Sequence, residues 1–190
     1  CIFDGLFCGA GVANYVRDRK SGAAEADASL FANSEKIESD KQQRLVDSRG
    51  SENPYVIAKE MGDEMTAAST VVKDAARLMQ ARNKLAELRD RFRRMSLSDT
   101  GLWTNQNLSF ARATHDMLIL AEAMIEGGLE RKESRGSHYR TDYPNRDDAN
   151  FRKTTVAKFN AESSKPSISF EDFDLPLVQP RARTYGKVGG

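Results

Sequence analysis

The feature that most constrains this sequence is a stripe of apolar residues spaced alternately three and four positions apart. Its members are Leu78, Ala81, Leu85, Leu88, Phe92 and Met95. This spacing places side chains on one face of an α-helix and is typical of the seam along which helices pack in a bundle. Charged residues occupy most of the positions between them, so we expect the opposite face to meet water. The stripe therefore predicts partner helices elsewhere in the chain.

Two other segments carry helical patterns that could cover this stripe. The first is predicted over residues 54–68, because Asn53 is a good capping residue and Pro54 suits the first helical position. Its apolar face comprises Ile57, Met61, Met65 and Ala68. The stripe itself lies in a helix predicted over residues 70–95, with Ser69 or Thr70 as its cap. A third helix is predicted over residues 105–132.

The third helix is apolar on two faces, which predicts a central place in the bundle. One face holds Leu108, Ala111, Leu118, Ile125 and Leu129, and the other holds Phe110, Met117, Ala121 and Met124. We interpret His115 as a satisfied core or groove histidine, because no second metal ligand follows it at three or four positions. The predicted fold class is therefore mainly α. Short connections favour an antiparallel three-helix bundle, followed by a small β-hairpin and an extended tail.

The segment before the bundle divides into an apolar part and a polar part. Residues 1–20 predict a helix that only tertiary packing could hold, because each of its three glycines costs about 1 kcal/mol of helix stability. Residues 21–52 predict a polar connector, with a solvated helix compatible with the stretch from Ala26 to Val46. The chain starts inside an apolar run without Met or a cleavage signal, so we expect it to be part of a longer protein.

Composition excludes several classes of function. Twenty-nine basic and 28 acidic residues leave a net charge of +1, which does not predict a nucleic-acid partner. The arginines that flank the apolar stripe are interpreted as a solvated helix face. Cys1 and Cys8 form no Cys-x-x-Cys pair and predict neither a disulfide framework nor a zinc or iron–sulfur site. No apolar run reaches the roughly 20 residues that a membrane-spanning helix needs.

Residues 133–148 form an unusually dense polar segment, which we call the polar corner. Its arginines at positions 135, 140 and 146 offer planar donor forks, and its aspartates at positions 142, 147 and 148 can accept them in pairs. Gly136 allows a positive φ, and Pro144 favours an extended Tyr143. One interpretation is a polar surface loop after a helix. The other, which we adopt as the prediction, is a partly desolvated network that docks two parts of a larger protein, with its arginines paired and buried.

The remaining residues predict a hairpin and a tail. Residues 151–159 have strand chemistry, with Phe151, Thr155, Ala157 and Phe159 on one side. Residues 160–166 turn the chain and residues 167–170 return. The tail to Gly190 carries Pro176, Pro180 and a basic pair, Arg181 and Arg183, and is expected to be extended.

The polar corner also carries a family resemblance. Its sequence, Glu-Ser-Arg-Gly-Ser-His-Tyr-Arg-Thr-Asp-Tyr-Pro-Asn-Arg-Asp-Asp, resembles a signature of the succinate dehydrogenase/fumarate reductase flavoprotein subunit. The resemblance implies that residues 1–20 are the last helix of an upstream flavin-binding domain and 21–52 a connector. Residues 53–133 would then be the helical bundle, and 134–190 the corner, hairpin and tail. The structural or interface candidates that match the signature are Arg135, His138, Arg140, Tyr143, Arg146 and Asp147.

The resemblance further implies succinate–fumarate oxidoreduction through FAD, with electrons passing to an iron–sulfur subunit and quinone. The family's flavin-binding and catalytic elements would lie upstream of Cys1, so we assign no catalytic, cofactor-binding or metal-binding residue to this chain. We expect the chain alone to be inactive and to bind no FAD. Its implied partners are the upstream flavin domain, the iron–sulfur subunit and a membrane anchor, at the cytoplasmic face of the inner membrane. Its implied role is bracing and interface formation.

Two alternatives remain. L-aspartate oxidase, a soluble relative, shares the Ser-Arg-Gly-x-His part of the corner, although the Asn145-Arg-Asp-Asp148 sequence and the hairpin beyond Phe151 resemble the respiratory branch. The second alternative is a helical interaction module without redox chemistry.

Overall fold

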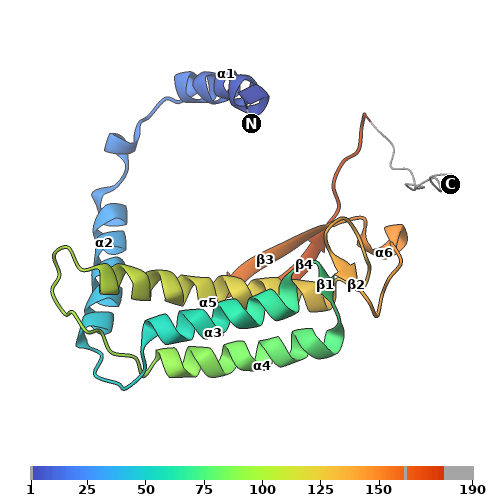
Figure 1. Ribbon diagram of the computed structural model, residues 1–190. Coiled ribbons are helices and arrows are strands. Elements are labelled where there is room, and N and C mark those ends of the chain that lie inside the picture. Colours follow the sequence, from blue (N-terminus) through green and yellow to red (C-terminus); the bar gives the residue numbers. More distant parts are fainter. Residues whose placement is uncertain (1, 161, 178–190) are drawn as a thin grey trace. The chain divides into compact units, whose positions relative to one another are not determined.

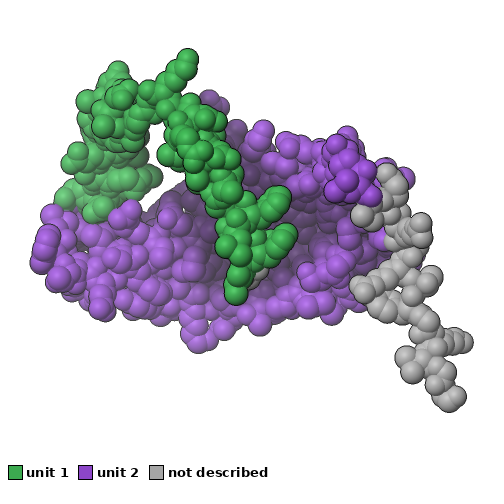
Figure 2. Space-filling view, turned by 90° about the horizontal axis from the view of Figure 1, so that it is seen from above, with its two compact units in different colours: residues 1–44 green, residues 45–190 purple. Residues whose placement is uncertain are grey.

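The computed structural model describes residues 2–160 and 162–177 of the 190-residue chain. The chain divides into two compact units, Cys1–Arg44 and Leu45–Gly190 (Figure 2). The described residues include no helix long and apolar enough to cross a membrane.

The first unit is helical and largely exposed. Helix α1 spans Ile2–Asp18, a short 3₁₀ turn, η1, spans Ala23–Glu25, and α2 spans Ala28–Asp47 and so continues into the second unit. The predicted apolar helix is therefore present, but none of the described side chains of α1 is buried. The solvated helix predicted near residues 26–46 is also present as α2, which buries only Val46.

The second unit contains the predicted antiparallel three-helix bundle (Figure 1). Its helices are α3, Pro54–Ser69; α4, Ala75–Phe92; and α5, Gln106–Glu130; and each packs against the other two. Every member of the stripe from Leu78 to Met95 is buried. The predicted faces of α3 and α5 meet it, with Ile57, Ala111, Leu118 and Ile125 at most 1% exposed. The alternation of three and four thus predicted the core correctly.

Side-chain caps fix where each bundle helix begins. Asn53 accepts a hydrogen bond from the Tyr55 amide at 2.9 Å, as its place before Pro54 predicted. Asn105 accepts from the Leu108 amide at 2.8 Å. The prediction that Ser69 or Thr70 caps the second helix was wrong, because Asp74 does so through the Arg77 amide at 2.8 Å.

The late start of α4 has a physical reason in the residues before it. Strand β1, Val72–Lys73, pairs in parallel with β2, Tyr139–Arg140. β-Branched residues favour this extended conformation, and the pairing partners lie far away in sequence, beyond the reach of a local pattern. The predicted helix therefore loses its first turn to a two-residue strand. At its other end α4 stops at Phe92, and Met95 is buried from the turn that follows.

The second apolar face predicted on α5 is mostly uncovered. Ala121 is buried and Phe110 is partly covered by stacking on Tyr55 with ring centroids 4.0 Å apart. Met117 and Met124 are exposed, so the prediction that both faces are buried in the bundle was wrong. His115 is also not a core residue: its side chain is 53% exposed and lies 3.1 Å from Asp116.

The arginines of α4 are neutralised by acids of the neighbouring helices. Arg91 contacts Glu60 of α3 at 2.7 Å and Glu52 at 3.0 Å. Arg89 contacts Glu122 of α5 at 2.6 Å. The flanks of the stripe thus form ion pairs at the surface of the bundle, with acids of the two neighbouring helices and of the segment before α3.

A hairpin completes the second unit. Strands β3, Thr154–Asn160, and β4, Lys165–Glu171, pair antiparallel, with Val156 opposite Ser169, and both contact α5. Phe151 was predicted in the first strand but lies in a one-turn helix, α6, Asp148–Phe151. Its ring packs edge-on against Phe170 with centroids 5.4 Å apart. Of the predicted tail, residues 178–190 lie outside the described residues, and with them Pro180, Arg181 and Arg183.

Leu85→Ala tests the bundle core. Leu85 is fully buried in α4, so we expect the free energy of unfolding to fall by about 2–5 kcal/mol in chemical denaturation. Met79→Ala is the matched control, because Met79 lies on the same helix and is 48% exposed. A loss below about 1 kcal/mol for Leu85→Ala, or equal losses for the two variants, would contradict this assignment of the core.

Candidate functional site

The ends of all three bundle helices lie next to the polar corner. Helix ends leave backbone amides or carbonyls without partners inside the helix, and a buried end needs other groups to satisfy them. The strand pair β1–β2 brings these ends together, because the Tyr139 amide donates to Val71 O at 3.2 Å and the Thr141 amide donates to Lys73 O at 2.9 Å. The corner is thereby fixed to the segment between α3 and α4.

Arg140 lies at the centre of this arrangement, and its side chain is only 1% exposed. Its Nη1 donates to Gly128 O at 2.5 Å and to Leu129 O at 3.4 Å, both in the last turn of α5. A cation in this position also interacts favourably with the negative end of the helix dipole. The guanidinium carbon lies 5.0 Å from the ring centroid of Tyr143. One buried side chain thus satisfies the end of α5.

Asp142 extends the same contact to the next helix. It accepts from Arg140 Nε at 2.8 Å and Nη2 at 2.7 Å, a two-point fork. It also accepts from the Ala75 amide, at the first residue of α4, at 3.1 Å. The hydrogen bonds from Arg140 are the main reason that the pKa of Asp142 is lowered to about 2. The Arg140–Asp142 pair therefore links the C-terminus of α5 to the N-terminus of α4.

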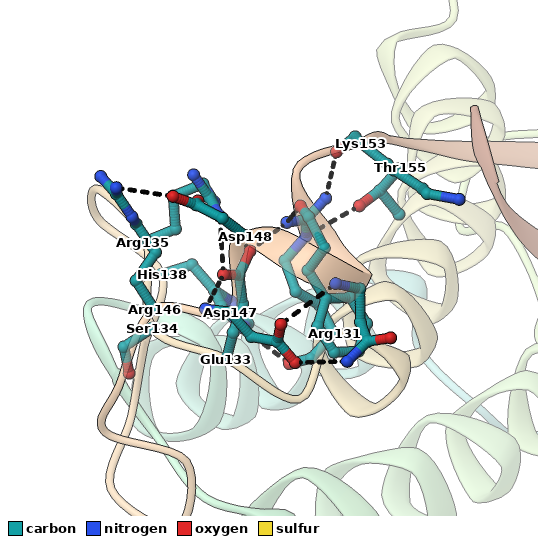
Figure 3. Close-up of polar contacts among 12 residues, drawn as sticks. Arg131, Glu133, Ser134, Arg135, His138, Arg146, Asp147, Asp148, Lys153 and Thr155 are labelled. Atoms are coloured by element: carbon teal, nitrogen blue, oxygen red, sulfur yellow. Dashed lines mark hydrogen bonds and ion pairs between the residues drawn. The ribbon is translucent and has the colours of Figure 1, made fainter. Parts of the chain in front are cut away.

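Glu133 forms a second centre of polar contacts (Figure 3). Its side chain is 0% exposed. Its two carboxylate oxygens accept from Arg131 Nη1 at 2.5 Å, from Arg135 Nε and Nη2 at 2.8 and 2.9 Å, and from the Asp147 amide at 2.9 Å. Burial is the largest single influence and opposes ionisation. The donors outweigh it together and keep the pKa of Glu133 below its ordinary value. The buried carboxylate is therefore charged and fully paired.

Arg131 attaches the hairpin to this centre (Figure 3). Besides Glu133, it donates to Phe151 O at 2.9 Å, to Lys153 O at 2.5 Å and to Thr155 Oγ1 at 3.0 Å. Its guanidinium also lies 5.5 Å from the ring centroid of Phe170 on β4. Residue 131 follows α5 directly, so one side chain joins the bundle, the corner and both hairpin strands.

The outer part of the corner is paired but only partly desolvated. Arg135 and Arg146 both contact Asp148, each at 2.7 Å, and their side chains are 31% and 33% exposed. Asp147 caps α6 by accepting from the Asn150 amide at 3.0 Å. The prediction that all the corner arginines are buried was therefore wrong for these two, which lie where the chain turns outwards.

His138 and Lys73 line the inner side of the corner. His138 is half-buried, and its Nε2 lies 3.1 Å from Arg131 O, the carbonyl that follows α5. Lys73 is 9% exposed, and its Nζ donates to the carbonyls of Thr70 and Val71 at the end of α3. Burial lowers the pKa of Lys73. Like Arg140, Lys73 is a cation at the C-terminal end of a helix, where it interacts favourably with the negative end of the helix dipole.

The structure brings all six candidates predicted from the sequence into this one corner. Three essential members were missed: Arg131, Glu133 as a buried centre, and Lys73. Arg131 and Glu133 flank Lys132 directly after the apolar pattern of α5 ends, and this cluster of charges was the available signal. Nothing near Lys73 in the sequence indicated burial, because its partners are backbone carbonyls and its strand pairs with residues 139–140.

The described polar groups of the corner are directed at one another and at helix ends, which suits them to holding elements together. Within residues 2–160 and 162–177, no group of three His, Cys, Asp or Glu residues could hold a metal ion. Every described buried side-chain polar atom of the corner has a hydrogen-bond partner. We therefore derive no catalytic step from these residues.

The fold and the corner define a three-helix domain closed by an internally paired polar corner and a hairpin. The sequence model of the family described as "Fumarate reductase flavoprotein C-term" matches residues 58–185. The chain belongs to this family.

The relatives agree with this assignment. The chain is 38% identical over 186 residues to the succinate dehydrogenase flavoprotein subunit of Bacillus subtilis, covering 98% of this chain and 32% of that protein. It is 35% identical over 137 residues to the fumarate reductase flavoprotein subunit of Haemophilus influenzae, covering 72% of this chain and 23% of that protein. The chain thus spans a third or less of the length of these relatives.

Solved structures show the same relationship. A quinol fumarate reductase of E. coli matches with a TM-score of 0.78 and 31% identity, covering 86% of this chain and 28% of that chain. An Sdh1 complex of Mycobacterium smegmatis matches with a TM-score of 0.71 and 26% identity, covering 90% and 28%. The adenylylsulfate reductase of Archaeoglobus fulgidus, at 19% identity and a TM-score of 0.64, shares the fold. The comparisons do not favour the L-aspartate oxidase alternative.

Glu133→Gln tests whether the buried carboxylate is the centre of the corner. The substitution leaves Arg131 and Arg135 without their shared negative charge, so we expect the free energy of unfolding to fall by about 3–5 kcal/mol. Asp63→Asn is the matched control, because it removes an exposed carboxylate paired with Lys59 on the surface of α3. We expect no measurable change for the control. Equal stability of Glu133→Gln and the unmodified chain would show that the network is dispensable.

Proposed function

We propose that this chain is the C-terminal helical region of a succinate dehydrogenase or fumarate reductase flavoprotein subunit, where it braces the flavin-binding part and forms interfaces. The observation that carries the proposal is the family match over residues 58–185, which includes the whole polar corner. The complete protein would interconvert succinate and fumarate through FAD. Its FAD-binding and catalytic residues would lie outside this chain.

The geometry of the corner supports a bracing role. Arginines that act on a substrate need donors directed into a pocket, whereas the forks of Arg135 and Arg140 are directed at Glu133 and Asp142. The exposed apolar faces of α1 and α5 support an interface role, because such faces on a soluble domain favour association. Under this proposal, residues 1–20 belong to the flavin-binding part, 21–52 connect, 53–133 form the bundle, and 134–190 form the corner, hairpin and tail.

The partners follow from the same proposal. Solved neighbours include a quinol-fumarate reductase with menaquinol molecules and an Sdh1 complex with UQ1. We accordingly propose that the complete protein passes electrons through an iron–sulfur subunit to a quinone, and that it is held by a membrane anchor at the cytoplasmic face of the inner membrane.

The isolated 190-residue chain provides a first test. We expect it to purify without FAD and to show no succinate oxidation with an artificial electron acceptor, because under this proposal the FAD-binding and catalytic residues lie outside this chain. Flavin absorbance and released FAD after denaturation measure occupancy directly. A stoichiometry of one flavin per chain would contradict the proposal that the FAD-binding residues lie outside this chain.

Arg135→Lys in the complete flavoprotein provides the second test. A lysine has one nitrogen and cannot reproduce the contacts of Nε and Nη2 with Glu133 and Asp148, so it should be nearly as harmful as Arg135→Ala. We expect less assembled, flavin-loaded enzyme with unchanged turnover per bound flavin. Arg93→Lys is the control, because Arg93 is an exposed arginine of α4's end paired with Asp90. Full flavin occupancy with turnover per flavin about a hundredfold lower would place Arg135 in the active site instead.

A further inference from the structure

His138 is the one half-buried histidine in the described part of the chain, and its surroundings are unusually basic. Three neighbouring cations disfavour a positive charge on its ring: Lys73 in β1, Arg140 in β2, and Arg131 directly after α5. The carboxylates nearby, Glu133 and Asp142, are occupied by arginines. No described carboxylate is within ion-pair distance of His138.

The histidine also fixes a turn of the corner to the bundle. Residues 135–138 form a tight turn in which the Arg135 amide donates to His138 O at 2.8 Å and the His138 amide donates to Arg135 O at 3.0 Å. Gly136 has a φ of 60° at its tip. The contact of His138 Nε2 with Arg131 O, at 3.1 Å, holds this turn against the end of α5. Nε2 is therefore the protonated nitrogen of the neutral ring, and it donates to that carbonyl.

We propose that His138 is a pH-sensitive latch: its neutral ring holds the Arg135–His138 turn against the end of α5, and its protonation releases that turn. A positively charged ring would be a fourth cation beside Lys73, Arg131 and Arg140. Because the ring is half-buried, rotation towards water relieves the repulsion but breaks the hydrogen bond to Arg131 O. The released segment would be residues 136–138, while Arg135 stays paired with Glu133 and Asp148, and Arg131 keeps the hairpin in place. The proposal does not depend on the redox role proposed above.

The direction of the pH effect follows from the environment. Burial and the three cations lower the pKa of His138 below its ordinary value, although the hydrogen bond to Arg131 O opposes the shift. With the turn released, the ring regains its ordinary pKa near 6.5. The released state therefore binds more protons, and latching weakens as the pH falls from above this ordinary value towards the lowered one. Each unit of difference corresponds to about a tenfold change in the latching equilibrium.

NMR titration of the unmodified chain tests this direction, because the chain has two histidines and their ring signals can be told apart. We expect the His138 ring to titrate below the ordinary histidine pKa near 6.5. A His138 midpoint at or above this ordinary value would overturn the proposal. This measurement needs no variant and so does not depend on whether a mutant folds.

Hydrogen exchange then tests the mechanical consequence. After correction for intrinsic exchange rates, we expect the amides of Arg135 and His138, which bond across the turn, to lose protection between pH 7.5 and pH 5.5, while amides in the middle of α4 remain unchanged. His138→Gln keeps a donor but cannot titrate, so its protection should not depend on pH in this range. His115→Gln should behave like the unmodified chain. Loss of protection that persists in His138→Gln, or that spreads equally over the bundle, would show that His138 is not the latch.

Discussion

The structure depends on the way in which buried charges satisfy helix ends at a single corner. The Arg140 guanidinium donates to the last carbonyls of α5, and the Asp142 carboxylate that it holds accepts from the first amide of α4. Lys73 does the same for the carbonyls at the end of α3. Each contact pairs a charge with the helix end of opposite polarity. The antiparallel arrangement makes this possible, because it brings one helix N-terminus and a helix C-terminus to the same place.

Around this centre, the second buried pair determines where the hairpin lies. Glu133 is dehydrated and surrounded by two arginines, and such a group adds little net stability because desolvation offsets most of the attraction. Glu133 acts mainly on geometry. Its two carboxylate oxygens accept from four donors, and the chain must follow a particular path to place all four around them. The corner thus specifies the direction in which residues 134–160 leave the bundle, while the apolar seam supplies most of the stability.

The sequence predicted the helices well, because their signal is local. The stripe from Leu78 to Met95 and the cap at Asn53 lie within a few positions of the residues that they order, and local sequence patterns capture such relations. The corner was predicted by composition and by family resemblance, but its individual hydrogen bonds and ion pairs were not. Arg131 and Lys73 donate hydrogen bonds to backbone carbonyls. The pattern of side chains in a sequence does not indicate which carbonyls will act as acceptors.

The errors follow the same division. The first turn of α4 was lost to a strand whose partner lies 67 positions away, a relation that no short window of sequence contains. The exposed Met117 and Met124 were assigned to the core because an apolar face predicts burial without saying what buries it. His115 was expected in the core or a groove because it lies within the helix and has no metal-ligand partner nearby, but its side chain is exposed. Hydrophobic periodicity therefore predicted the type of each element reliably. It predicted which faces are buried only where the covering element lies in the same bundle.

The parallel pairing of β1 with β2 has a consequence for the order in which this protein is made. Strand β1 lies between the first and second helices of the bundle, but its partner is synthesised only after the third helix is complete. Closing so long a loop is slow compared with forming helices. On the ribosome, the end of α3 and the beginning of α4 therefore lack the β1–β2 pairing until some 70 further residues have been synthesised. Truncation of translation between residues 131 and 139 would give a chain with all three bundle helices but without the β1–β2 pair, so that the end of α3 and the beginning of α4 stay open to exchange and proteolysis.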